Sequence, residues 1–203
     1  MAYTAGTGFR YWKTLSGNPA APAPQRFRIA NSATLRIGDL VRVNNAGLLV
    51  TSASGSAPCG VLKGFVDQNG INPFSLGYSG AGVTLTGDDT LATASDNTTR
   101  AQYITGEVYV DVAGDILWLN DSDGSLAQTN VFQFFDPDAN GRQVASGTAS
   151  DSNGVLQLIE WDPQGTSNEP NNPLAADASK GAFRIAENQF GIGIDTGTAK
   201  VAA

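Results

Sequence analysis

Residues 106–120 read GEVYVDVAGDILWLN and contain two consecutive strand patterns. In the first, Val108, Val110 and Val112 alternate with Glu107, Tyr109 and Asp111, which is typical of a strand with one buried and one solvent-facing side. In the second, residues 116–119 are apolar on both faces, which predicts a central strand of a sheet. The two patterns together indicate a mainly β fold.

Similar patterns recur along the chain. The clearest hairpin is DLVRVNNAGLLV, in which two apolar runs flank a turn whose Gly47 can adopt a positive φ. In QRFRIA, Arg26 and Arg28 alternate with apolar residues, which places both arginines on the outer face of one strand. Further strands are expected at residues 59–66, 130–135, 154–161 and 183–190.

The chain is expected to form one domain with appended segments, because 203 residues suffice for a single core. We predict a mainly β fold, a single β-barrel or β-sandwich-like domain, with one short helix between Asn172 and Gly181. The Pro/Ala-rich GNPAAPAPQ favours extended backbone. The predicted parts are an extended N-terminal arm at 1–25, a β-rich body at 26–190 with a long surface excursion at about 68–100, and a C-terminal tail at 191–203. We find no internal repeat in the sequence.

The amino-acid composition excludes several common classes of catalytic site. The chain has no histidine and one cysteine, Cys59, so no His-based nucleophile and no Cys/His zinc site can form. We therefore expect no enzyme activity, no metal and no cofactor. We find no signal peptide pattern and no apolar run long enough to span a membrane, so we expect synthesis in the cytoplasm and no membrane partner.

Charge is unevenly distributed along the chain. Residues 1–38 hold five basic residues and no acid, whereas the remainder holds 7 basic and 19 acidic residues, a net charge of −12. Five spread cations are a weak footprint for nucleic acid, so an acidic protein surface is the expected partner, unless the arm folds back onto the body. Large aromatics beside cations are typical of interface anchors. The candidate binding residues are Phe9, Arg10, Tyr11, Trp12, Lys13, Arg26 and Arg28.

An acidic loop offers a possible metal site. Asp136, Asp138 and Asn140 precede Gly141 with the spacing of an EF-hand calcium loop. The twelfth position, where a bidentate acid is needed, is Gly147. We therefore favour a turn in which the side chains bond their own backbone.

Paired carboxylates and aromatic residues offer two further alternatives. Asp111 and Asp115 have a spacing that allows acid–base catalysis in principle, but we expect both in loops or on solvent faces. Trp118 and Trp161, with Trp12 and several tyrosines, suit a sugar-stacking platform, although both residues fit core positions better. A β-sandwich module that binds a glycan or a receptor is therefore the alternative function.

Several short segments together resemble a family of tailed-bacteriophage structural proteins, the capsid decoration or cement proteins. In chain order the segments are GFRYWKTLSGNP, FRIA, LRIGDLVRV, CGVLKGF, VYVDVAGDILWLNDSDGSLAQTNV, VLQLIEWDPQGTSNEPNNP and FRIAENQF. The resemblance covers most of the chain. It implies a β-rich protein without catalytic residues, made in the host cytoplasm and located on the outer capsid surface of the virion. Its partner would be the major capsid protein, and we expect a homo-oligomer, either a dimer or a trimer.

Overall fold

A computed structural model describes residues 8–16, 20–30, 33, 35–66, 105–139, 141–161 and 180–190. The regular structure of these residues is almost entirely β. The described strands are β1 (Arg10–Thr14), β2 (Gln25–Arg28), β3 (Leu40–Val43), β4 (Leu49–Thr51), β5 (Gly60–Val66), β6 (Thr105–Val110), β7 (Ile116–Asp121), β8 (Phe134–Pro137), β9 (Val144–Ser150), β10 (Leu156–Trp161) and β11 (Lys180–Ile185), and one 3-10 helix, η3 (Gln128–Asn130), precedes β8.

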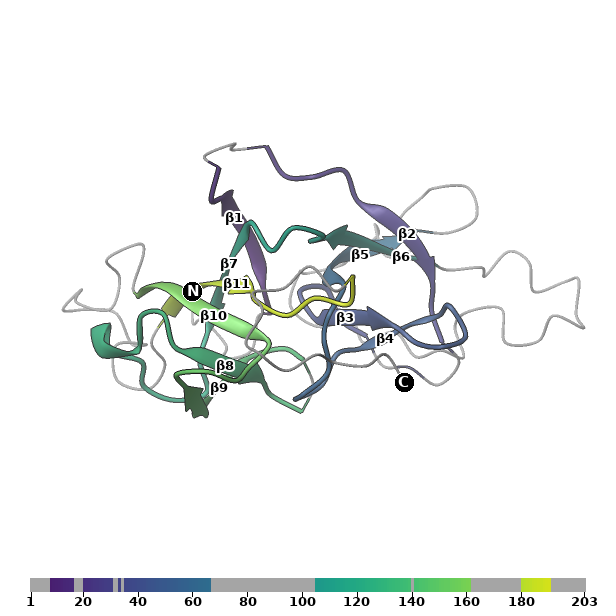
Figure 1. Ribbon diagram of the computed structural model, residues 1–203. Helices are drawn as coiled ribbons and strands as arrows, with labels where there is room; N and C mark the ends of the chain where they lie inside the picture. Colours follow the sequence, from purple (N-terminus) through teal and green to yellow (C-terminus); the bar gives the residue numbers. More distant parts are fainter. Residues whose placement is uncertain are drawn as a thin grey trace, which may run out of the picture.

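The strands form two antiparallel sheets that occupy opposite halves of the molecule (Figure 1). One sheet has the order β1-β7-β11-β10-β8-β9, and the other has the order β2-β6-β5-β3-β4. Neither described sheet closes into a barrel, so the mainly β prediction is confirmed in its β-sandwich-like form. No helix in the described part of the chain is long and apolar enough to cross a membrane.

Two sequence predictions are confirmed in detail. The turn between β3 and β4 is held by Asn44, whose Oδ1 accepts the backbone N–H groups of Ala46 at 2.9 Å and Leu48 at 3.0 Å. Gly47 in this turn has a φ of 76°, which favours glycine. The predicted central strand is β7, in which every residue is buried and which lies between β1 and β11.

The prediction of an arm outside the body is wrong for residues 9–14. Arg10–Thr14 form β1, which pairs with β7 so that Tyr11 lies opposite Trp118. Phe9 is only 2% exposed and belongs to the larger core. The inward and outward alternation of Phe9, Arg10 and Tyr11 is that of a strand, and it outweighs the loop character of the Pro/Ala segment that follows. Residues 20–24, which precede β2, run along one side of the molecule (Figure 1).

Other boundaries also differ from the predictions. Residues 144–150 are mostly small and polar and are not among the predicted strands, but they form β9, an edge strand paired with β8. The strand predicted from residue 130 begins only at Phe134, because η3 and a turn come first. Lys180 and Gly181, expected to end a helix, begin β11. The rest of that helix, the excursion at 68–100 and the tail at 191–203 lie outside the described residues.

The structure contains an internal repeat that the sequence does not reveal. We define the first β-unit as β2–β6 and the second β-unit as β7–β11. When the strands of each unit are numbered along the chain, both sheets have the order one-five-four-two-three with antiparallel neighbours. In each unit the residue after strand one makes an isolated parallel bridge to the first residue of strand three, Ile29 to Leu49 and Ser122 to Val144. β1 lies outside this plan and adds a sixth strand to the second unit.

The correspondence extends to single residues. The pairing of strands four and five shifts register at Lys63 in the first unit and at Ile159 in the second. Gly106 and Gly181 occupy the same place on strand five. An added Cβ would lie 3.0 Å from Leu62 Cδ1 at Gly106 and 2.5 Å from Leu158 Cδ1 at Gly181. The two interiors are therefore packed on one plan, with a strand-four leucine filling the space beside each glycine.

A buried ion pair and a shared core join the two units. Arg142, in the turn after β8, donates from Nη1 to Asp39 Oδ1 at 2.8 Å and from Nη2 to the Ile37 carbonyl at 3.4 Å. Burial raises the pKa of Asp39 to about 6 in spite of the opposing pull of Arg142, so Asp39 is ionised at neutral pH. Leu40 and Val61 of the first unit pack into the core of the second. These contacts fix the units relative to each other.

Candidate interaction surface

Apart from Phe9 and Tyr11, the residues of the predicted binding set are exposed or half-exposed and lie on two strands, one from each sheet. Arg10, Trp12 and Lys13 belong to β1, and Arg26 and Arg28 belong to β2. β1 and β2 lie along the same side of the molecule (Figure 1). We call these five residues the N-terminal surface. It spans both β-units, because β1 extends the sheet of the second and β2 begins the first.

Phe9 and Tyr11, also predicted as binding residues, are turned inward. Phe9 is buried, and its N–H donates to the Gly38 carbonyl at 2.7 Å. Tyr11 is half-buried, with its ring centroid 6.3 Å from those of Tyr109 and Trp118. Both residues therefore attach β1 to the body, and Phe9 is not available as an exposed anchor.

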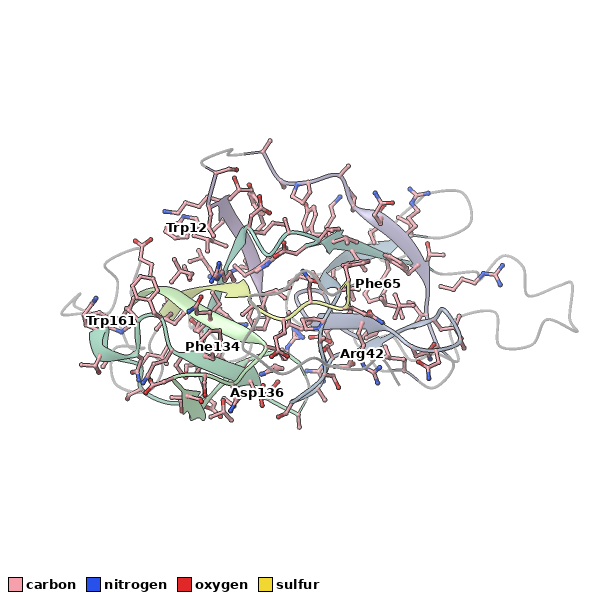
Figure 2. All side chains as sticks on the ribbon, viewed as in Figure 1. Trp12, Arg42, Phe65, Phe134, Asp136 and Trp161 are labelled. Carbon is pink, nitrogen blue, oxygen red and sulfur yellow. The ribbon has the colours of Figure 1, made fainter. Side chains whose placement is uncertain are left out.

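Trp12 and Lys13 form the aromatic part of the N-terminal surface. Trp12 sits where the register between β1 and β7 shifts, and Lys13 Nζ lies 3.7 Å from the centroid of its ring, a cation–π contact. Lys13 Nζ is also 3.5 Å from Glu160 Oε2, but the two side chains are 43% and 44% exposed, so this ion pair adds little stability. Figure 2 shows Trp12 and Trp161 at the end of the molecule formed by the six-stranded sheet.

Arg26 and Arg28 form the cationic part. Both are exposed and alternate with the half-buried Phe27, as predicted for one face of a strand. Arg26 Nε lies 3.3 Å from Glu107 Oε1 on β6, and Lys63 Nζ on β5 lies 3.6 Å from Oε2 of the same residue. Two cations thus pair with one acid across three strands, which leaves this group with a net positive charge.

The sequence does not indicate which acidic residues pair with the cations of this surface. Glu160 and Glu107 come from strands far along the chain from Lys13 and Arg26, and no local pattern connects them. Opposite charges on neighbouring strands are a recognisable pairing, but it becomes usable only when the strand order is known.

The acidic turn at 136–141 uses its carboxylates for internal hydrogen bonds. Asp138 Oδ1 accepts two backbone N–H groups, the nearer being that of Arg142 at 2.7 Å. Asp136 Oδ2 accepts the Ser54 hydroxyl at 3.1 Å. The turn interpretation is confirmed for Asp138, and Asn140 lies outside the described residues. Within the described ranges, no group of three or more His, Cys, Asp or Glu residues gathers as metal ligands.

Asp111 is buried, contrary to the prediction of a solvent-facing carboxylate. β6 ends at Val110, and the chain then turns so that Val112 is exposed and Asp111 is not. Trp118 Nε1 donates to Asp111 Oδ2 at 3.5 Å, while Oδ1 has no hydrogen-bond partner among the described residues. Burial raises the pKa of Asp111 to about 6, and the neighbouring Asp115 carboxylate adds to the rise against hydrogen bonds that lower it.

Asp111→Asn is expected to raise stability at neutral pH. The pKa of Asp111 rises from its ordinary value of 3.8 to about 6 in the folded chain, so the folded state binds the proton more tightly and stability falls as the pH rises through this interval. Asparagine carries no charge, so the variant should gain about 3 kcal/mol at pH 7 and almost nothing near pH 3.5. Urea unfolding at the two pH values measures the gain, and an equal effect at both would contradict the assignment.

No protein-family model matches the chain, and no curated protein or solved structure matches it either. What the N-terminal surface can do therefore follows from its own chemistry. It is a strip of cations with one tryptophan, carried by two β-units that are fixed to each other.

Proposed function

We propose that the protein is a non-enzymatic structural component of a phage virion that binds the outer surface of the head and cements neighbouring major capsid subunits. The observation that carries this proposal is that the N-terminal surface crosses from one β-unit to the other. A surface on two joined units can contact two adjacent subunits of a lattice at once, which strengthens binding beyond either contact alone. The resemblance of the short sequence segments to capsid cement proteins supports the same function.

The charge of the surface suits an acidic protein partner. Arg10, Lys13, Arg26 and Arg28 present cations, whereas residues 39–203 carry a net charge of −12. Complementary charge orients two proteins as they meet. An aromatic side chain that becomes buried on binding, such as that of Trp12, slows their separation. Neither contribution requires a catalytic group.

The junction between the units suits a load-bearing role. A cement protein resists the separation of the subunits it holds, so its own parts must not slide apart. The buried Asp39–Arg142 pair and the core shared through Leu40 and Val61 supply that resistance. We infer that the chain acts as a rigid clamp.

Neutralising β2 is expected to weaken binding to heads in a salt-dependent way. The double variant Arg26→Gln, Arg28→Gln should bind purified heads that lack this protein less tightly at 50 mM salt, and the difference should shrink at 500 mM salt because screening removes most of the charge contribution. Co-sedimentation with heads measures both. The matched control Arg26→Lys, Arg28→Lys keeps the charge and should bind like the wild type.

Two results would contradict the proposal. One is wild-type protein that fails to bind heads at either salt concentration. The other is specific binding on a glycan array, since a capsid cement protein has no reason to select a sugar, and this result would favour the glycan-binding alternative.

A further inference from the structure

Phe132 combines strained backbone with an exposed aromatic ring. Its φ is 72°, and it is the one non-glycine residue with a positive φ in the described part of the chain. Bulky side chains avoid this region because the Cβ crowds the backbone. The side chain is nevertheless 65% exposed, so packing in the core does not explain the strain.

The internal repeat shows what the backbone requires at this position. The counterpart of Phe132 in the first unit is Gly38, whose φ is 89°. The Gly38 N–H donates to the Leu62 carbonyl at 2.8 Å, and the Phe132 N–H donates to the Leu158 carbonyl at 2.7 Å. Glycine meets this left-handed conformation without strain. The second unit therefore has phenylalanine at a position where the first unit has glycine, which adopts this φ without strain.

Buried polar groups hold the Phe132 loop in place. Gln157 is 8% exposed, and its Nε2 donates to the Phe132 carbonyl at 2.9 Å. Arg184 Nε donates to Gln157 Oε1 at 2.8 Å. In the first unit the matching Gly38 carbonyl instead accepts the N–H of Phe9, so the N-terminal segment covers that position. The second unit leaves the equivalent position uncovered by β1 and presents a ring on a rigid support.

The residues near Phe132 in the chain, and the side chain that they bond to, are mostly polar and uncharged. Gln128 and Thr129 are exposed, and Asn130 Nδ2 donates to Gln133 Oε1 at 2.7 Å. Gln133 in turn donates to Asp151 Oδ1 at 2.9 Å, the one acid in this network. An exposed aromatic residue among polar neighbours is typical of contacts between different proteins, whereas homodimer interfaces are more apolar.

We propose that Phe132 is an apolar anchor that inserts into a hydrophobic pocket on the capsid subunit. This inference rests on the proposed function and adds a second contact, separate from the N-terminal surface. The ring would lose its exposed area to the pocket, and the pre-set loop would lose little conformational freedom on binding. Binding thus compensates for strain that the free protein carries.

Phe132→Gly is expected to make the free protein more stable and its binding weaker. Relief of the left-handed strain, partly offset by the extra freedom of glycine in the unfolded chain, should raise Tm by about 2 °C. Loss of the ring should weaken binding to heads about 30-fold. Phe132→Asn, which tolerates positive φ, should weaken binding similarly. Phe190→Gly removes another exposed phenylalanine, 47% exposed at ordinary φ, and should neither raise Tm nor weaken binding.

The outcomes separate this inference from the proposed function. If Phe132→Gly and wild type bind heads equally, Phe132 is not the anchor, although the cement function stands. If the wild type does not bind heads, both proposals fail. A lower Tm in both Phe132 variants would make the residue structural and overturn the anchor. Loss of self-association by Phe132→Gly with unchanged head binding would assign the ring to a second copy of this chain, and would also overturn it.

Discussion

Trp118→Ala is expected to lower the free energy of unfolding by about 3–5 kcal/mol, because it removes the largest buried side chain at the junction of the two units. Trp118 is fully buried in β7, between β1 and β11. Its ring lies 6.3 Å, centroid to centroid, from both Tyr11 and Tyr109. The substitution also removes the hydrogen bond to Asp111, leaving that buried carboxylate with less support.

Chemical denaturation followed by circular dichroism measures this loss, because the substitution removes part of the tryptophan fluorescence. Trp12→Ala is the matched control, since Trp12 is half-exposed and should cost much less. Wild-type stability in Trp118→Ala would mean that Trp118 is accessible. That result would revive the sugar-stacking platform, which needs an accessible ring at this position.

Strands that carry a clear apolar pattern of their own could be predicted from the sequence, at sheet edges (β2 and β4) as well as inside, whereas β9 and β1 could not. β6 and β7 carry their apolar pattern locally, so their burial follows from periodicity. β9 consists of small and polar residues, and only its pairing with β8 makes it a strand. β1 does alternate at Phe9, Arg10 and Tyr11, but the pattern is short, and its partner β7 lies about a hundred residues along the chain.

The candidate surface, too, could be predicted only in part from the sequence. Arg26 and Arg28 were placed correctly because alternation on one strand determines their shared face. Phe9 and Tyr11 were misplaced because an aromatic residue beside a cation has the same composition in an interface anchor and in an edge strand. Phe132 could not be singled out in the sequence, since NVFQFF is typical of a strand, and its strain is visible only in its backbone φ.

The internal repeat was hidden because the two units share geometry rather than residues. Strand order, the isolated bridges and the register shift are properties of backbone pairing, which many apolar side chains can satisfy. The residues that do correspond, such as Gly106 with Gly181 and Leu62 with Leu158, are too few and too widely spaced to stand out in one sequence.

Arg142→Met is expected to destabilise the protein by about 3–5 kcal/mol at pH 8, because it leaves Asp39 buried without its partner. Arg142 and Asp39 are 103 residues apart in the chain, and their atoms meet at 2.8 Å between the two units. Arg142 pulls the pKa of Asp39 down against the rise caused by burial. The substitution therefore raises that pKa further, and the carboxyl takes up a proton more readily.

The pH dependence distinguishes a lost ion pair from lost packing. At pH 5 the carboxyl of Asp39, whose pKa is already about 6 in the wild type, is mostly protonated with or without Arg142, so the cost of Arg142→Met should be smaller there than at pH 8. Adding Asp39→Asn to Arg142→Met removes the unpaired charge and should recover part of the loss at pH 8. A cost that is the same at both pH values, with no recovery in the double variant, would show that Arg142 joins the two units through the packing of its side chain and not through its charge.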